Sequence, residues 1–137
     1  MNELPEGWAE TTVGHVCGEA PKIDPRSEPD AEFTYIDISG VDGEAGLISV
    51  THDLTGRDAP SRARQLVAAG DVVVSTVRTY MRKTAVVPAG LDNAVASTGF
   101  SVLRPTEVID PRLLFFAVRH PDFVERLSAR QTGSSYP

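Results

Sequence analysis

The sequence contains a single cysteine, Cys17, and no apolar run near the length of a membrane-spanning helix. One cysteine excludes an intrachain disulfide and agrees with a reducing compartment. A membrane helix needs about 20 consecutive apolar residues. The first residues, MNELPEGWAETT, are polar and acidic, so no signal peptide is expected. The sequence therefore predicts a cytoplasmic protein with no membrane partner.

Motifs that bind nucleotides or metals are also missing. Neither GxxxxGK[ST] nor GxGxxG occurs, and no Cys and His residues stand at zinc-ligand spacing. Asp122 and Glu125 weakly resemble a nuclease carboxylate pair, but no lysine follows where a metal-dependent nuclease needs one. A solvated helix face explains these two acids better. We expect no cofactor, no metal and no catalysis, so a binding module is favoured over an enzyme.

Charge is distributed unevenly along the chain, whose formal net charge is -6. Residues 1–58 hold 13 Asp and Glu against 3 Lys and Arg, whereas residues 59–137 hold 6 against 10. A basic face on an acidic molecule is compatible with this asymmetry. An acidic, solvated front half with locally paired arginines is the alternative, and charge alone does not decide between the two.

The stretch Gly70–Lys83, GDVVVSTVRTYMRK, predicts a buried strand that ends in charge. Its β-branched valines favour a strand. Alternation places Val72 and Val74 on one side and Val73 on the other. Arg78, Arg82 and Lys83 follow within six positions. A strand that delivers cations to the surface is typical of a phosphate-contacting site. An ordinary strand end has the same pattern.

At 137 residues, 41% of them hydrophobic, the chain is expected to form one domain over residues 1–137. The patterns predict an α+β fold: a mixed or antiparallel β-sheet core with short helices packed on it, mostly near the C-terminus. Further strands are expected at 33–39, 47–50, 84–87, 94–97 and 100–103, loops at 18–31 and 51–60, and helices at 61–69, 112–120 and 122–130. The 112–120 helix, capped by Asp110 and Pro111, is apolar around most of its circumference, so it is expected to be buried.

Seven stretches then occur in a recognisable order: LPEGW at 4–8, YIDISGVD at 35–42, SRAR at 61–64, GDVVVSTVR at 70–78, ASTGFSVLRP at 96–105, DPRLLFFAV at 110–118 and TGSSYP at 132–137. Together the sequence resembles a target recognition domain of the specificity (S) subunit of Type I restriction-modification systems. The resemblance implies a non-catalytic α+β domain that binds one half of a split double-stranded DNA sequence. It also implies partners: modification subunits that methylate adenine with S-adenosylmethionine, and a restriction subunit in the full complex.

This chain has neither the long spacer helix nor the second recognition domain of a whole subunit, so a half subunit or a fragment is expected. We expect phosphate contacts from five cations: Arg62, Arg64, Arg78, Arg82 and Lys83. The resemblance supports Arg62 and Arg64, on the expected helix, and Arg78. Bases would be read in the major groove by polar residues of two or three loops: Thr51, His52, Arg57, Thr79, Tyr80, Ser134, Ser135 and Tyr136.

Ordinary roles remain open for single residues: Arg64 as a cap for a carbonyl, His52 idle on the surface and Tyr80 in the core. For the whole chain, the alternative is a protein-interaction or regulatory module that does not contact DNA, which the acidic front half favours. The slope of DNA affinity against salt separates the two, because protein docking releases no phosphate counterions.

Overall fold

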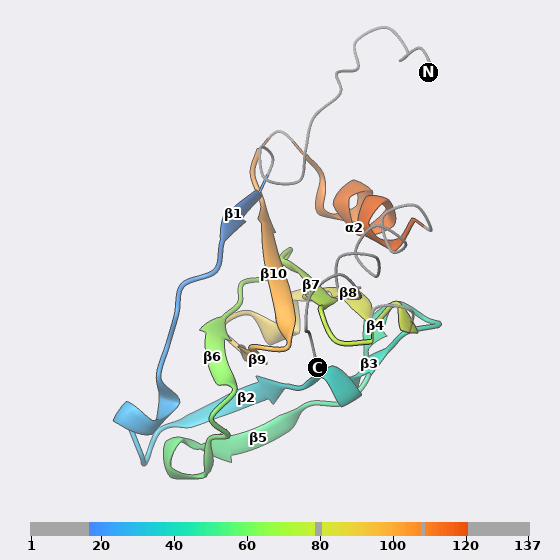
Figure 1. The fold of residues 1–137 in the computed structure, drawn as a ribbon. Coiled ribbons are helices and arrows are strands. Elements are labelled where there is room, and N and C mark those ends of the chain that lie inside the picture. The colour runs from blue at the N-terminus through green and yellow to red at the C-terminus, as the bar shows by residue number, and fades with distance from the viewer. Residues whose placement is uncertain (1–16, 79–80, 108, 121–137) are drawn as a thin grey trace, which may run out of the picture.

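Two four-stranded sheets and one α-helix form the part of the chain that the computed structural model describes, residues 17–78, 81–107 and 109–120 (Figure 1). The first sheet is antiparallel, in the order β1 (Cys17–Glu19), β10 (Phe100–Pro105), β7 (Val72–Ser75) and β8 (Thr84–Val86). The second is mixed, in the order β5 (His52–Thr55), β2 (Glu32–Ile36), β9 (Val95–Ser97) and β6 (Ala63–Leu66). Only the β2–β9 pair of these sheets is parallel.

A short hairpin and the α-helix pack against the first sheet. β3 (Val41–Asp42) and β4 (Leu47–Ile48) form a hairpin that contacts β8. The α-helix, α2 (Pro111–Arg119), packs on β8 and β7. Four 3-10 turns complete the described elements: η1 (Pro25–Ser27), η2 (Ile38–Gly40), η3 (Gly56–Asp58) and η5 (Ala89–Leu91). The predicted α+β fold with a mixed sheet core is therefore confirmed.

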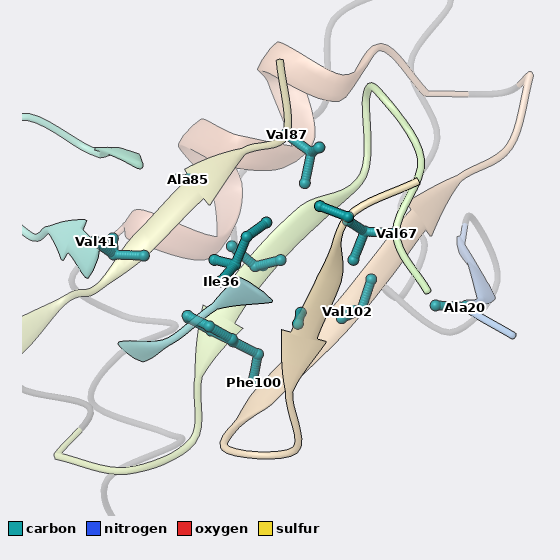
Figure 2. Packing of buried hydrophobic residues seen from close by; sticks show 11 residues of the cluster. Ala20, Ile36, Val41, Val67, Ala85, Val87, Phe100 and Val102 are labelled. Carbon is teal, nitrogen blue, oxygen red and sulfur yellow. The ribbon is translucent and has the colours of Figure 1, made fainter. Parts of the chain in front are cut away.

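The main core lies between the two sheets. Ile36 from β2 and Val73 from β7 meet there, together with Phe100 and Val102 from β10. Figure 2 shows these side chains, apart from the unlabelled Val73, converging with Val67 on the same space. Burial of apolar surface in such a cluster is the main force that holds two sheets together.

β7 is buried on both faces, as its valine run predicts. Val73 points into the main core, whereas Val72 and Val74 pack against Leu114 and Val118 of α2. The alternation predicted for this strand is therefore confirmed. The strand is fixed from both sides, so the chain that follows it leaves the sheet from a rigid base.

The predicted helix over 61–69 is wrong: the structure has strand β6 there. The sequence SRARQLVAA fits a helical period, but Ala63 and Gln65 alternate into the sheet and are buried. Gln65 donates from Nε2 to the carbonyls of Ser97 and Phe100, at 2.8 and 2.9 Å. Pairing with β9 therefore outweighs local helix propensity.

Four further expectations need correction. The loop expected at 51–60 contains β5 and η3, and the loop expected at 18–31 begins within β1 and contains η1. The strand expected at 33–39 ends at Ile36, where Asp37 caps η2. α2 is capped by Asp110 as predicted, but it is not buried all round: Leu113 is 49% exposed and Phe116 68%. A helix lying on one sheet face buries only the side chains of that stripe.

Within the described residues, no helix is long and apolar enough to cross a membrane. The helix expected at 122–130 lies outside the described residues.

Candidate nucleic-acid interface

The connection between β7 and β8, residues 76–83, carries the basic residues Arg78, Arg82 and Lys83, and we call it the β7–β8 loop. Ser75, the last residue of β7, holds both ends of the loop: its hydroxyl donates to the Val77 carbonyl at 2.6 Å and its amide to the Lys83 carbonyl at 3.0 Å. Both Arg78 and Arg82 have positive φ, 49° and 52°. Non-glycine residues enter this region rarely, and mostly where surrounding contacts hold them. The loop therefore has a defined conformation set by its neighbours.

The loop borders a pocket of about 300 Å³ against η2. Lys83 donates from Nζ to the carbonyl of Ile38 at 3.4 Å, which ties the loop to the end of β2. The pocket combines apolar walls with cationic and hydroxyl groups: Ile38, Ser39, Val77, Arg78, Met81 and Lys83. A concave, partly apolar surface edged with cations suits an anionic ligand that also carries flat or methylated groups.

Two predicted base readers lie next to η2. The amides of Ser49 and Val50 donate to the carbonyl of Gly40 at 2.8 and 3.2 Å, which brings the chain before β5 against η2. Thr51 and His52 follow at once, and His52 begins β5 as an exposed residue. The structure therefore brings Thr51 and His52 to the same end of the second sheet as Lys83.

Arg62 is exposed, and backbone hydrogen bonds through the β9–β10 turn link its segment to the β7–β8 loop. The Arg62 carbonyl accepts from the amide of Thr98 at 2.9 Å. The carbonyl of Gly99, the residue after Thr98, accepts from the amide of Thr76 in the β7–β8 loop at 2.9 Å. Among the described residues, neither Arg62 nor Arg78 forms an ion pair with a carboxylate. These guanidinium groups remain available to an anion from outside the described chain.

Arg57 and Arg64 differ, because each pairs with a carboxylate. Arg57 pairs with Asp30, and Arg64 Nη1 lies 3.2 Å from an oxygen of Asp24. Arg64 also donates from Nε to the carbonyl of Ser61 at 3.1 Å, the ordinary capping role left open by the sequence. Arg57 belongs to η3, at the far end of β5 from His52. The structure does not bring these two arginines to the β7–β8 loop.

The two ends of β2 therefore differ in how their arginines are paired. Glu32 begins this strand beside the η1 and η3 turns, and these turns with the chain between them carry further acids: Asp24, Glu28, Asp30 and Asp58. The strand ends four residues later, at Ile36, close to the Ile38 carbonyl that Lys83 contacts. At about 3.3 Å per residue, the two ends lie about 13 Å apart. We call the surface formed by the β7–β8 loop, η2, the start of β5 and the end of α2 the basic end.

The basic end also contains residues that sequence reasoning missed. Arg119, the last residue of α2, donates to the carbonyls of Arg82 and Gly43, at 3.1 and 3.0 Å. The sequence places Arg119 on a helix but carries no signal that this helix ends beside the β3–β4 hairpin. Leu47, Val50 and Met81 add exposed apolar side chains on or next to this hairpin and loop.

Five predicted base readers lie outside the described residues: Thr79, Tyr80, Ser134, Ser135 and Tyr136. Among the residues that are described, no group of three or more His, Cys, Asp or Glu side chains is placed to hold a metal ion.

The fold and this surface define a small α+β domain that presents several cations without an ion pair among the described residues at one end. No protein-family model matches the chain. The Type I restriction enzyme EcoAI specificity subunit of Escherichia coli is 26% identical over 143 residues, covering 97% of this chain and 23% of that protein.

Solved structures agree. The HsdS subunit from Thermoanaerobacter tengcongensis superposes with a TM-score of 0.92 at 38% identity, covering 99% of this chain and 35% of that one. A chain from a study of complex assembly and conformational transition in the type I R-M system gives 0.92 at 37% identity, covering 100% and 36%. The chain is thus a homologue of Type I specificity subunits and spans between 23% and 36% of their length. The predicted resemblance is confirmed.

Proposed function

We propose that residues 1–137 are a single target recognition domain, which binds one half of a split DNA sequence for a Type I restriction-modification complex. The homologues support this proposal because they are specificity subunits, the component named for choosing the target. In this proposal the chain is not catalytic, and it acts in the cytoplasm with modification subunits and, in the full complex, a restriction subunit. No comparison favours the alternative of a module that avoids DNA.

One observation carries the proposal: the basic end presents cations that no carboxylate of the described residues pairs with, whereas four arginines elsewhere, Arg57, Arg64, Arg104 and Arg112, form ion pairs. Arg78, Arg82, Lys83 and Arg62 would contact phosphates and set the position of the domain on the duplex. Thr51 and His52 would face base edges beside them. Contacts to phosphates raise the affinity for DNA of any sequence. Contacts to base edges determine which sequence is preferred.

The test is the affinity of the full chain for a short mixed-sequence duplex, measured by fluorescence anisotropy over a range of salt concentrations. A single half-site should bind near the non-specific range, roughly 10⁻⁴–10⁻⁶ M at physiological salt, with log affinity falling linearly with log salt. A flat plot would remove phosphate contacts from the proposal.

Two arginine variants sharpen this test. Both Arg78 and Arg57 are exposed, but Arg78 lies in the β7–β8 loop and Arg57 pairs with Asp30 at the acidic side. Arg78→Gln should lower the salt slope by about one unit, and Arg57→Gln should leave it unchanged. If Arg57→Gln lowers the salt slope and Arg78→Gln does not, the DNA binds at the other end of β2.

A further inference from the structure

Arg82 and Arg119 are joined by reciprocal hydrogen bonds across two elements distant in sequence. Arg82 donates from Nη2 to the carbonyl of Arg119 at 2.8 Å, and Arg119 donates from Nη1 to the carbonyl of Arg82 at 3.1 Å. Arg119 Nη2 reaches the carbonyl of Gly43 at 3.0 Å. The two guanidinium groups are thus held at the junction of the β7–β8 loop, the β3–β4 hairpin and α2.

This junction brings two positive charges together, and no carboxylate of the described residues forms an ion pair with either. Burial and then the nearby Arg82 charge lower the pKa of Arg119. The four ion pairs formed among the described residues use other arginines. Two like charges held close destabilise the protein unless an anion lies between or beside them.

Both guanidinium groups keep donors for such an anion. A guanidinium carries five N–H donors in one plane. Toward the described residues, Arg82 uses one of its donors and Arg119 two, and the Arg119 guanidinium lies 5.3 Å from the ring centroid of Phe115. Arg82 is exposed and Arg119 half-buried, so both residues are open to solvent. Planar forks of this kind bind phosphate oxygens in pairs.

We propose that Arg82 and Arg119 together bind one phosphate of the DNA backbone, so that α2 contributes to the DNA-facing surface through its last residue. This inference rests on the proposed function and adds a residue that the sequence pattern does not single out. Because the donors come from a loop and a helix, one phosphate would fix both relative to the duplex. A bound phosphate would relieve the repulsion between the two positive guanidinium groups, and this relief would add to the binding free energy. The site therefore favours a phosphate over a neutral ligand.

Duplex binding tests the shared phosphate. Arg82→Gln and Arg119→Gln should each reduce affinity about tenfold and lower the salt slope by about one unit. The double variant should lower the slope by no more than either single variant, since one phosphate is lost in all three. A loss of about two units in the double variant would mean two separate phosphates and would overturn the pairing. Arg112→Gln is the control, because Arg112 lies at the exposed start of α2 and pairs with Asp110.

Inorganic phosphate provides a test that needs no DNA. The arginine Nε–Hε signals of Arg82 and Arg119, followed by NMR in the full chain, should shift together and saturate as phosphate is added. The Arg112 signal should not change. Unchanged Arg82 and Arg119 signals beside salt-dependent duplex binding would overturn this site and leave the proposed function standing. If the signals shift and saturate with phosphate but duplex affinity does not depend on salt, the result would contradict both the binding of a DNA phosphate at this site and the proposed function.

Thermal unfolding of each variant separates lost binding from lost structure. Arg82→Gln removes one bond and keeps the Arg119 bond to Gly43, so this variant should remain folded at the temperature of the binding experiment. If folded Arg82→Gln binds duplex like the unmodified chain, the phosphate site is wrong.

Discussion

Arg104 holds the buried carboxylate of Asp71 with two hydrogen bonds, from Nε at 3.0 Å and from Nη2 at 2.8 Å. The side chain of Asp71 is 2% exposed and that of Arg104 33%. The same Asp71 carboxylate accepts from the amide of Ala68 at 2.9 Å, which closes the turn that leads into β7. The hydrogen bond to Asp71 is the main cause of a raised pKa at Arg104. This pair therefore anchors the strand on which the β7–β8 loop depends.

The unequal burial of the two partners predicts unequal costs of removing them. Arg104→Met leaves an almost fully buried carboxylate without its cation, and this should cost about 3–5 kcal/mol of unfolding free energy. Asp71→Asn leaves an arginine that can turn toward water, so its cost should be smaller. Urea unfolding measures both. Arg112→Met, which removes an exposed pair, should change stability by less than about 1 kcal/mol. Equal costs for the two Arg104–Asp71 variants would show that burial does not govern the pair.

Gln65 is the residue that distinguishes strand β6 from the helix that the sequence predicts. Its amide group is buried and bridges the carbonyls of Ser97 and Phe100 across the β9–β10 turn. Gln65→Leu should cost about 1–3 kcal/mol, because two buried carbonyls lose a donor. Arg62→Ala, an exposed change just before the same strand, should cost under about 0.5 kcal/mol. A neutral Gln65→Leu would mean that the two carbonyls find water or other donors.

Local patterns predict the elements that local forces determine. β7 is recognisable because three consecutive valines suit a strand buried on both faces, and the start of α2 because Asp110 and Pro111 are a strong cap. β6 is missed because its buried glutamine looks like an exposed helical residue until β9 is beside it. β5 is missed for the related reason that the strand HDLT is polar at an open edge of the sheet.

The candidate site divides in the same way. The cations of the β7–β8 loop follow from the sequence, because a buried strand must end before charged residues begin. Their partners do not follow, because Arg119 and Gly43 are distant in sequence and only the packed fold brings them to Arg82. The sequence likewise does not predict the ion pairs of Arg57 with Asp30 and of Arg64 with Asp24. The partners in each pair are distant in sequence, and the fold around η1 brings them together.

Gly43 gives a test of how closely the β3–β4 hairpin must approach the β7–β8 loop. A Cβ at this position would collide with the backbone carbonyl of Met81. Gly43→Ala should therefore displace the loop, cost about 1–3 kcal/mol and weaken duplex binding. Gly90→Ala is the matched control, since a Cβ there meets nothing within 4 Å. Both stability and duplex affinity should be unchanged in the control. Normal binding by a folded Gly43→Ala variant would show that the position of the loop does not matter for DNA.

The proposed readers and the proposed anchors should respond differently to mutation. Thr51 and His52 precede and begin β5, whose pairing with β2 sets Tyr35 opposite His52, so the position of these residues is fixed by the sheet. Arg78 stands in a loop that leaves a buried strand and offers a charge, which any phosphate satisfies. Substituting Thr51 or His52 by alanine should therefore change which bases are preferred, at roughly 1–3 kcal/mol for each lost base contact. Arg78→Gln should weaken binding to all sequences about equally.

Selection of bound duplexes from a randomised pool, followed by sequencing, measures both effects in the full chain. The unmodified chain should enrich a short motif, His52→Ala should lose preference at one or two positions of it, and Arg78→Gln should keep the motif at lower affinity. If Arg78→Gln changes the motif while His52→Ala only weakens binding, the two roles are exchanged, and the β7–β8 loop enters the groove instead of the start of β5. That result is physically reasonable, because an arginine can also bind guanine through two hydrogen bonds. The two arrangements differ by a rotation of the duplex over the same basic end, and the motif positions lost in each variant decide between them.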